Sequence, residues 1–402
     1  MHRLLLSLLL IFVSFPLLAA EPPRPKVGLV LSGGAARGLA HIGVLKALEE
    51  QGIQIDAIAG TSMGTVVGGL YASGYKVEEL EKLALGIDWQ QALSDAPPRK
   101  DVPFRRKQDD RDFLVQQKLS FRDDGSLGLP LGVIQGQNLA LLLESMLAHA
   151  SDTRDFDKLP IPFRAVATDI ASGEKVVFRR GHLPQVIRAS MSIPAVFAPV
   201  ELDGRLLVDG GMVDNIPLDV AREMGVDLAI VVDIGTPLRS RKELATVVDV
   251  LNQSITLMTR RNSEEQLAAL HRDDILIQPP LASFGVTDFG RAQEMIDAGY
   301  RAARALDARL ATLKRPEEND VELNVARSPS QRNPVITAIR IENDSKVSDD
   351  VIRFYIRQPI GEPLELGRLQ TDMGTLYGLD YFDRVQYRVI HKGDEHTLVI
   401  NA

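Results

Sequence analysis

The sequence Gly60-Thr61-Ser62-Met63-Gly64 follows an apolar run at 53–59 and precedes a stretch of helical character at 65–72. A serine flanked by glycines between a strand and a helix is typical of a nucleophile elbow. Such a turn holds the serine backbone in a strained conformation, and a Cβ atom on either side would collide with it. We therefore take Ser62 as the first candidate for a nucleophile, with Gly60 and Gly64 as supporting residues.

A second glycine-rich segment, Ser32-Gly33-Gly34-Ala35-Ala36-Arg37-Gly38, joins a buried strand at 26–31 to a periodic helix at 39–50. Small residues at a helix N-terminus expose backbone N–H groups that can bind an anion. We expect Gly33, Gly34 and Ala35 to supply the donors of an oxyanion hole, supported by Gly38.

The same loop has a competing interpretation as a dinucleotide-binding fingerprint. Ala35 stands where that fingerprint has its second glycine, which hinders the approach of a pyrophosphate. The acidic residue needed for ribose binding could only be Asp56, which precedes the end of the elbow strand. These departures favour the oxyanion interpretation.

A carboxylate follows a third strand. The short apolar run 205–208 leads into Asp209, with Gly210 and Gly211 behind it. The carboxyl edge of an open α/β sheet carries the site, so we expect three strands to bring N–H donors, a hydroxyl and a carboxylate to one rim.

The sequence does not supply an obvious histidine for a triad of the order Ser, Asp, His. His271 lies in a charged stretch, and His391 and His396 lie near the C-terminus in what is expected to be a separate module. His41, in the helix after the glycine loop, is interpreted as a residue that packs or hydrogen-bonds against that loop. The sequence therefore favours a dyad in which Asp209 accepts the proton of Ser62.

With these motifs the chain resembles the patatin-like phospholipases over about residues 26–312. That family carries a glycine-rich oxyanion loop, a GxSxG serine and a DG[AG] aspartate, matched here by Gly33 to Gly38, Ser62 and Asp209-Gly210-Gly211. The resemblance implies a three-layer α/β/α domain and a Ser-Asp dyad without histidine. Ala35 departs from the family's third glycine: its N–H can donate, but a positive φ there would carry strain. Further segments resemble those of the family: 167–169, 189–197, 233–235 and 285–289.

Composition bounds the domain count and the class of protein. The chain has 402 residues, of which 45% are hydrophobic and 25% charged, which suits one large domain and a smaller one. A net charge of −8 argues against general nucleic-acid binding. No metal-ligand spacing is visible, no cofactor is expected, and an oligomer is left open.

The N-terminus is interpreted as a secretory signal peptide over residues 1–20. Arg3 supplies the positive charge, 4–13 the apolar core and Leu18-Ala19-Ala20 the cleavage region. A permanent anchor is disfavoured, since the apolar run is short and Pro16 interrupts it. We expect export to the periplasm, the outer membrane or the medium, which the absence of cysteine fits.

Two segments of the large domain have open interpretations. The polar stretch 95–132 is either a lid bordering the site or a surface excursion. The apolar helix at 139–147 is interpreted as core in preference to a membrane contact.

After a charged linker at 313–333, residues 334–402 show the order β-α-α-β-β. This order resembles a POTRA domain, the periplasmic module that precedes outer-membrane β-barrels; another small α+β domain is the alternative. The succession of signal peptide, patatin and POTRA resembles self-exporting (type V-like) proteins. No barrel segments follow, so we expect either part of a longer protein or a product without its own translocator. An outer-membrane barrel or its assembly machinery is a candidate partner.

The expected function is an exported serine acyl hydrolase of phospholipase A type, acting on phospholipids or other lipid esters at a membrane surface. A general lipid esterase or an acyltransferase is the alternative within the same chemistry. A non-enzymatic secretion or interaction scaffold, acting through the POTRA-like domain, is the alternative of another class.

Overall fold

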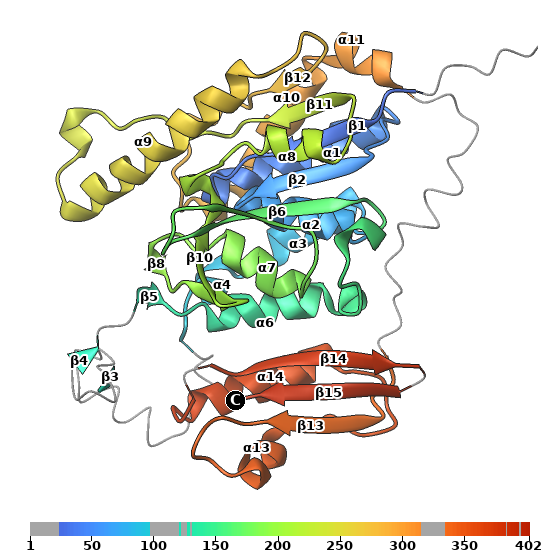
Figure 1. Ribbon diagram of the computed structural model, residues 1–402, viewed down its shortest axis with the longest axis vertical. Coiled ribbons are helices and arrows are strands. Elements are labelled where there is room, and N and C mark those ends of the chain that lie inside the picture. Colours follow the sequence, from blue (N-terminus) through green and yellow to red (C-terminus); the bar gives the residue numbers. More distant parts are fainter. Residues whose placement is uncertain are drawn as a thin grey trace, which may run out of the picture.

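The computed structural model describes residues 24–96, 120–121, 127–128, 131–314, 334–382, 384–393 and 395–402. They form two domains, each with its own sheet and apolar core (Figure 1). The signal peptide expected at 1–20, most of the linker at 313–333 and most of the 95–132 stretch lie outside the described residues. Within those residues, no helix has both the length and the apolar character needed to cross a membrane.

The main sheet has the order β12-β11-β1-β2-β6-β10-β9, with β7 also paired to β6. Its parallel strands are β1 (Val27–Leu31), β2 (Ala57–Thr61), β6 (Phe163–Asp169), β11 (Leu228–Val232) and β12 (Ile275–Ile277). The strands β7 (Lys175–Phe178), β9 (Val200–Leu202) and β10 (Arg205–Asp209) are antiparallel to their partners. Every residue of β1, β2, β6 and β11 is buried, as expected for a parallel sheet covered on both faces.

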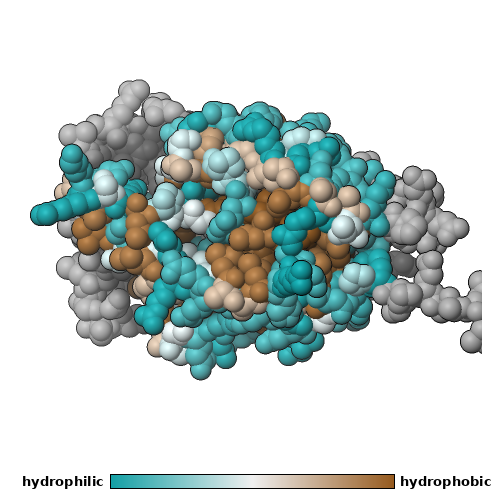
Figure 2. Space-filling view, turned by 90° about the horizontal axis from the view of Figure 1, so that it is seen from above, coloured by the Kyte–Doolittle hydropathy of each residue, from teal (hydrophilic) through white to brown (hydrophobic). Residues whose placement is uncertain are grey.

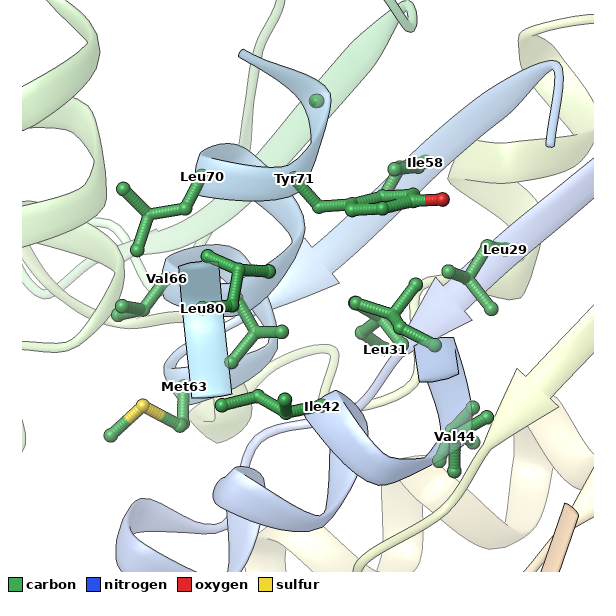
Figure 3. Packing of buried hydrophobic residues seen from close by; sticks show 14 of the residues in the cluster. Leu29, Leu31, Ile42, Val44, Ile58, Met63, Val66, Leu70, Tyr71 and Leu80 are labelled. Carbon is green, nitrogen blue, oxygen red and sulfur yellow. The ribbon is translucent and has the colours of Figure 1, made fainter. Parts of the chain in front are cut away.

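Helices cover both faces of this sheet. One layer contains α1 (Ala40–Glu50), α2 (Met63–Ala72), α3 (Val77–Gly86), α6 (Gln137–Met146), α7 (Leu183–Ser190) and α10 (Ala292–Arg304). Leu29, Leu31 and Ile58 of the sheet pack against this layer (Figure 3). The opposite face packs against α8 (Leu218–Glu223) and the C-terminal part of α9 (Val247–Ala268). The predicted three-layer α/β/α architecture is confirmed.

Shorter elements connect these layers. They are η1 (Ala35–Leu39), α4 (Trp89–Ala92), the pair β3 (Ser120–Phe121) and β4 (Leu127–Gly128), the pair β5 (Gly132–Ile134) and β8 (Ala195–Phe197), η4 (Gly210–Met212) and α11 (Asp307–Leu310).

The C-terminal domain has the predicted β-α-α-β-β order. It consists of β13 (Ala338–Glu342), α13 (Asp349–Tyr355), α14 (Leu366–Gly378), β14 (Gln386–Lys392) and β15 (Glu395–Asn401). The sheet order is β13-β15-β14, with β13 parallel and β14 antiparallel to the central strand β15. Both helices contribute residues to the apolar core of this C-terminal module, which is therefore a small α+β domain.

Helix α6 belongs to both cores. Leu139 and Leu143 pack in the core of the main-sheet domain, whereas Leu141 is buried among residues of the C-terminal domain. At the start of the helix, the side-chain oxygen of Gln137 accepts the N–H of Val385 at 3.1 Å, and its amide nitrogen donates to the Val385 carbonyl. The apolar helix predicted at 139–147 is therefore core, but it is shared between two domains.

The direction of β10 corrects one step of the sequence argument. Asp209 was expected at the site by the carboxyl-edge rule, which describes parallel strands. β10 runs antiparallel to β6 and places Asp209 opposite Ala167, while Thr61 of β2 lies opposite Val166. β6 continues beyond the end of β2, and Asp209 lies beside this extension, one residue past the position opposite Thr61.

Candidate active site

Ser62 occupies the sharp turn between β2 and α2. Its backbone has φ 53° and ψ −123°, in the region that L residues rarely adopt. A Cβ on Gly64 would lie 2.2 Å from the Leu31 carbonyl oxygen, and one on Gly60 would lie 2.7 Å from backbone atoms of Gly64. The two glycines thus allow the strand, the turn and the helix to approach closely enough to hold the serine in this conformation.

The Ser62 hydroxyl donates a hydrogen bond to Asp209. The Oγ–Oδ2 distance is 2.6 Å, and both residues are buried. The other carboxylate oxygen accepts the N–H of Gly211 at 2.8 Å. A Cβ on Gly210 would lie 2.3 Å from the Val166 carbonyl oxygen, so this glycine lets the Asp209 turn pack against β6. The structure thereby brings together the two residues that the sequence singled out from distant strands.

Burial raises the pKa of Asp209 to about 6, against the opposing effect of the hydrogen bonds from Ser62 and Gly211. The carboxyl is therefore ionised at neutral pH, yet it is more basic than an exposed aspartate. These are the properties of a group that accepts a proton from a hydroxyl.

The glycine loop lies beside this pair. Gly33, Gly34 and Ala35 line the same pocket as Ser62 and Asp209. The N–H of Gly33 donates to the Asn215 carbonyl at 3.3 Å, and that of Ala36 donates to Val286 at 3.1 Å. The N–H groups of Gly34 and Ala35, in contrast, form no hydrogen bond within the described part of the chain. These two are the donors that remain for an oxyanion.

Ala35 has φ 49°, which is the left-handed region. A glycine would adopt this conformation without strain, whereas an alanine is destabilised in it. The departure from the family's glycine therefore carries the strain that the sequence argument associated with a positive φ.

Several contacts fix the position of the loop. A Cβ on Gly38 would lie 2.2 Å from the Met63 side chain, so this glycine packs directly against the residue after Ser62. Arg37 donates to the carbonyls of Gly235 at 2.8 Å and Leu281 at 3.0 Å. The Nε2 of His41 lies 2.8 Å from the Ser32 carbonyl oxygen, and burial lowers the pKa of His41 to about 4.

The histidines thus take no part in the contacts of Ser62 seen in the described residues. His41 is neutral at ordinary pH and contacts the loop. In the C-terminal domain, His391 lies 2.9 Å from Asp152, and its ring is tilted by 58° against that of His396 with 4.3 Å between the ring centroids.

Four residues of the site were not identified from the sequence: Arg188, Ser190, Ser192 and Asn215. The Ser62 N–H donates to the Oγ of Ser190 at 3.0 Å, and that hydroxyl donates to the Val166 carbonyl at 2.6 Å. The Arg188 guanidinium contacts the Ser192 hydroxyl, and the Ser192 carbonyl accepts the N–H of Asp209 at 2.9 Å. Asn215 holds Gly33. A buried serine and a buried arginine in the largely buried helix α7 are the signal that could have identified Ser190 and Arg188.

The pocket around Ser62 has a volume of about 530 Å³. Its far wall consists of α9 residues, including Asn252, Ile255, Thr256 and Thr259, and of the proline-rich segment 278–282. The sequence argument did not predict either wall.

Asp95, at the start of the stretch considered as a lid, caps α6 by accepting the N–H groups of Gly136 at 2.8 Å and Gln137 at 3.0 Å. Among the described residues, no group of His, Cys, Asp and Glu side chains is placed to hold a metal ion.

Comparison with family models places both domains. Residues 29–222 match the model described as patatin-like phospholipase, and residues 334–402 match the POTRA model, described as surface antigen variable number repeat. The chain carries a patatin-like phospholipase domain followed by a POTRA domain.

Curated relatives resemble the patatin-like domain. An uncharacterized NTE family protein of Mycobacterium bovis is 37% identical over 52% of this chain and 49% of its own length. Patatin-like phospholipase domain-containing protein 7 of Rattus norvegicus is 30% identical over 68% of this chain and 20% of its own length. The chain therefore spans about half or less of the length of these relatives. Among solved structures, VipD from Legionella pneumophila aligns with a TM-score of 0.40 and 18% identity, covering 71% of this chain and 67% of that chain.

Proposed function

We propose that the protein is an exported serine acyl hydrolase of phospholipase A type that cleaves ester-linked acyl chains from phospholipids through the Ser62–Asp209 dyad. The observation that carries the proposal is the 2.6 Å hydrogen bond between these side chains, beside two N–H groups without a partner in the described chain. The patatin-like family model and its relatives support lipid esters as the substrate class.

The reaction follows from this geometry. Asp209 takes the hydroxyl proton as the Ser62 Oγ attacks the ester carbonyl carbon, and the N–H groups of Gly34 and Ala35 stabilise the oxyanion. Collapse of the intermediate breaks the ester bond, and the leaving alcohol takes the proton from Asp209. A water molecule then attacks the acyl-enzyme and gives its proton to Asp209, and the second collapse returns that proton to Ser62 and releases the fatty acid.

The strain at the site argues against a passive scaffold. Ser62 and Ala35 both have positive φ, and Asp209 is buried with a raised pKa. Backbone strain and shifted pKa values destabilise the fold and persist only where the surrounding structure maintains them. Both features cluster at functional sites. We assign the POTRA domain the separate role of contacting an outer-membrane barrel or its assembly machinery, in the periplasm, at the outer membrane or during secretion.

The test combines covalent labelling with two dyad variants. A fluorophosphonate probe should label Ser62, as located by peptide mapping, and vesicles should yield free fatty acid and lysophospholipid. Ser62→Ala should lower turnover about 10³-fold or more, and Asp209→Asn nearly as much, because its amide cannot accept the proton. His271→Ala is the matched control and should be close to wild type.

Three outcomes would contradict the proposal in different ways. A folded Ser62→Ala variant with substantial turnover would remove the nucleophile assignment. Loss of activity in His271→Ala with an active Asp209→Asn would establish a histidine triad. Ester cleavage without fatty acid release from any phospholipid would assign the chain to general esterases, and transfer of the acyl group to an added alcohol in preference to water would assign it to acyltransferases.

A further inference from the structure

Exposed apolar side chains are unevenly distributed over the patatin-like domain. Among the large apolar residues described between 24 and 314, all the exposed ones except Leu85 on α3 lie in or beside β5, β8 and the end of β6, in α9 or in the segment that leads into α9. Figure 1 shows these elements, β5, β8 and the start of α9, together with β10, at the left of the molecule. The side chains are Leu131, Val133, Ile170, Val196, Leu238, Val250, Leu251, Leu257 and Met258.

Helix α9 presents two different faces. Positions 252, 255, 256 and 259 line the pocket. At 100° per residue, positions 250, 251, 257 and 258 form one stripe on the opposite face. These four, Val250, Leu251, Leu257 and Met258, are all exposed, Val250 by 54% and Leu257 by 51%. The apolar stripe of a helix on a globular protein normally faces the core, so a solvent-facing stripe marks a surface that binds something.

Seen from above, apolar side chains form a group at the centre of the face and another nearer its left end (Figure 2). The left end is the side on which α9 begins in Figure 1. The two charged residues Arg241 and Lys242 lie in the segment that leads into α9, are exposed, and form no ion pair with a described residue. Uncompensated cations next to apolar side chains are the combination with which interfacial helices bind anionic lipid surfaces.

We propose that the outer stripe of α9, formed by Val250, Leu251, Leu257 and Met258, docks the enzyme on a phospholipid bilayer. The inference rests on the proposed function, because the inner face of α9 lines the pocket that holds Ser62. Docking by the outer face holds the pocket about one helix diameter, roughly 10 Å, from the bilayer, which shortens the path of an acyl chain from the lipid to Ser62. The exposed apolar side chains of β5, β8 and the end of β6 extend the same contact, which favours a broad lipid surface over a narrow protein groove.

The test uses the full chain with Val250→Gln and Leu257→Gln combined. Glutamine keeps helix propensity, and neither side chain lines the pocket, so turnover of a soluble short-chain ester should stay within about twofold of wild type. Flotation with vesicles containing phosphatidylglycerol, performed in a Ser62→Ala background, should show vesicle binding reduced about tenfold or more. Vesicle hydrolysis by the active double variant should fall in parallel. Phe354→Gln, which changes an exposed apolar residue on α13, is the matched control and should bind vesicles as the wild type does.

Each alternative outcome overturns the docking proposal. Unchanged vesicle binding by the double variant would show that the stripe does not contact the membrane. Equal loss of soluble-ester turnover would show that the residues act on folding or on the pocket. A wild-type dimer that the double variant converts to a monomer, with vesicle binding intact, would assign the stripe to a second copy of the chain. Because flotation needs no turnover, failure of the proposed hydrolase activity would be seen separately.

Discussion

The glycines around Ser62 and Asp209 differ from two glycines of the POTRA domain in how closely neighbouring atoms approach them. A Cβ added at Gly38, Gly64 or Gly210, all next to Ser62 or Asp209, would lie 2.2, 2.2 and 2.3 Å from neighbouring atoms. In the POTRA domain, Gly361 and Gly367 have open space around the same position. The proposed catalytic centre is thus assembled by backbone approaches that only glycine permits, whereas Gly361 and Gly367 make no such approach in the POTRA domain.

The largest effect that would test this contrast is expected from Gly64→Ala. Its Cβ would collide with the Leu31 carbonyl, which belongs to a buried strand and cannot move aside. We expect a loss of about 3 kcal/mol or more in the free energy of unfolding, with loss of turnover, measured by urea denaturation and ester hydrolysis.

Gly367→Ala is the matched substitution in the POTRA domain. Position 367 lies in helix α14 with no neighbour within 4 Å, so alanine should be neutral or stabilising by up to about 1 kcal/mol. Equal effects of the two substitutions on stability would refute the contrast.

A smaller effect is expected from pH. The pKa of Asp209 is raised to about 6, and the proposed dyad requires its ionised form. Turnover of an uncharged soluble ester should therefore be constant above about pH 7 and fall about tenfold per unit as the pH drops below 6. If His41 were the base, the fall would begin near its lowered pKa of about 4.

Asp214 provides the control for this profile. Its pKa is raised to about 7, chiefly by burial, and its carboxylate lies 3.0 Å from the Lys175 ammonium group. An Asp214→Asn variant should keep the inflection near pH 6. A profile that loses this inflection in Asp214→Asn would show that Asp214, and not Asp209, controls the activity in this range.

The sequence predicted the parts of the site that short local patterns determine. Ser62 and the glycine loop each follow a buried strand, and strand-turn-helix geometry depends on residues close together in the chain. The direction of β10 was not predictable in this way, because a strand with three apolar residues, 206–208, looks the same in sequence whether it runs parallel or antiparallel. The pairing with β6 that decides it joins residues about forty positions apart.

Long-range contacts explain the other omissions. The inner face of α9 is mostly polar, with Asn252, Thr256 and Thr259 beside Ile255, so its sequence has no apolar stripe that would indicate a pocket wall. The contact of Ser190 with the Ser62 N–H depends on how α7 packs over β6. The sharing of α6 between two cores was hidden for the same reason, since its apolar residues cannot indicate which neighbour covers them.

The smallest effect is expected when the POTRA domain is removed by ending the chain at Lys314. None of the described POTRA residues lines the pocket of Ser62, so soluble-ester turnover should stay within about twofold of the full chain. Stability should fall nonetheless, because Leu141, 5% exposed in the full chain, loses its cover, and Gln137 loses both hydrogen bonds to Val385. Exposure of one leucine corresponds to about 2 kcal/mol.

The single tryptophan of the chain, Trp89, stacks on Phe289 within the patatin-like domain, so its fluorescence during urea denaturation reports on that domain alone. Replacing Leu141 by Gln in the shortened chain should recover solubility without changing turnover. If the shortened chain instead unfolds or loses turnover, the POTRA domain completes the hydrolase fold through α6, and the two domains form one cooperative unit.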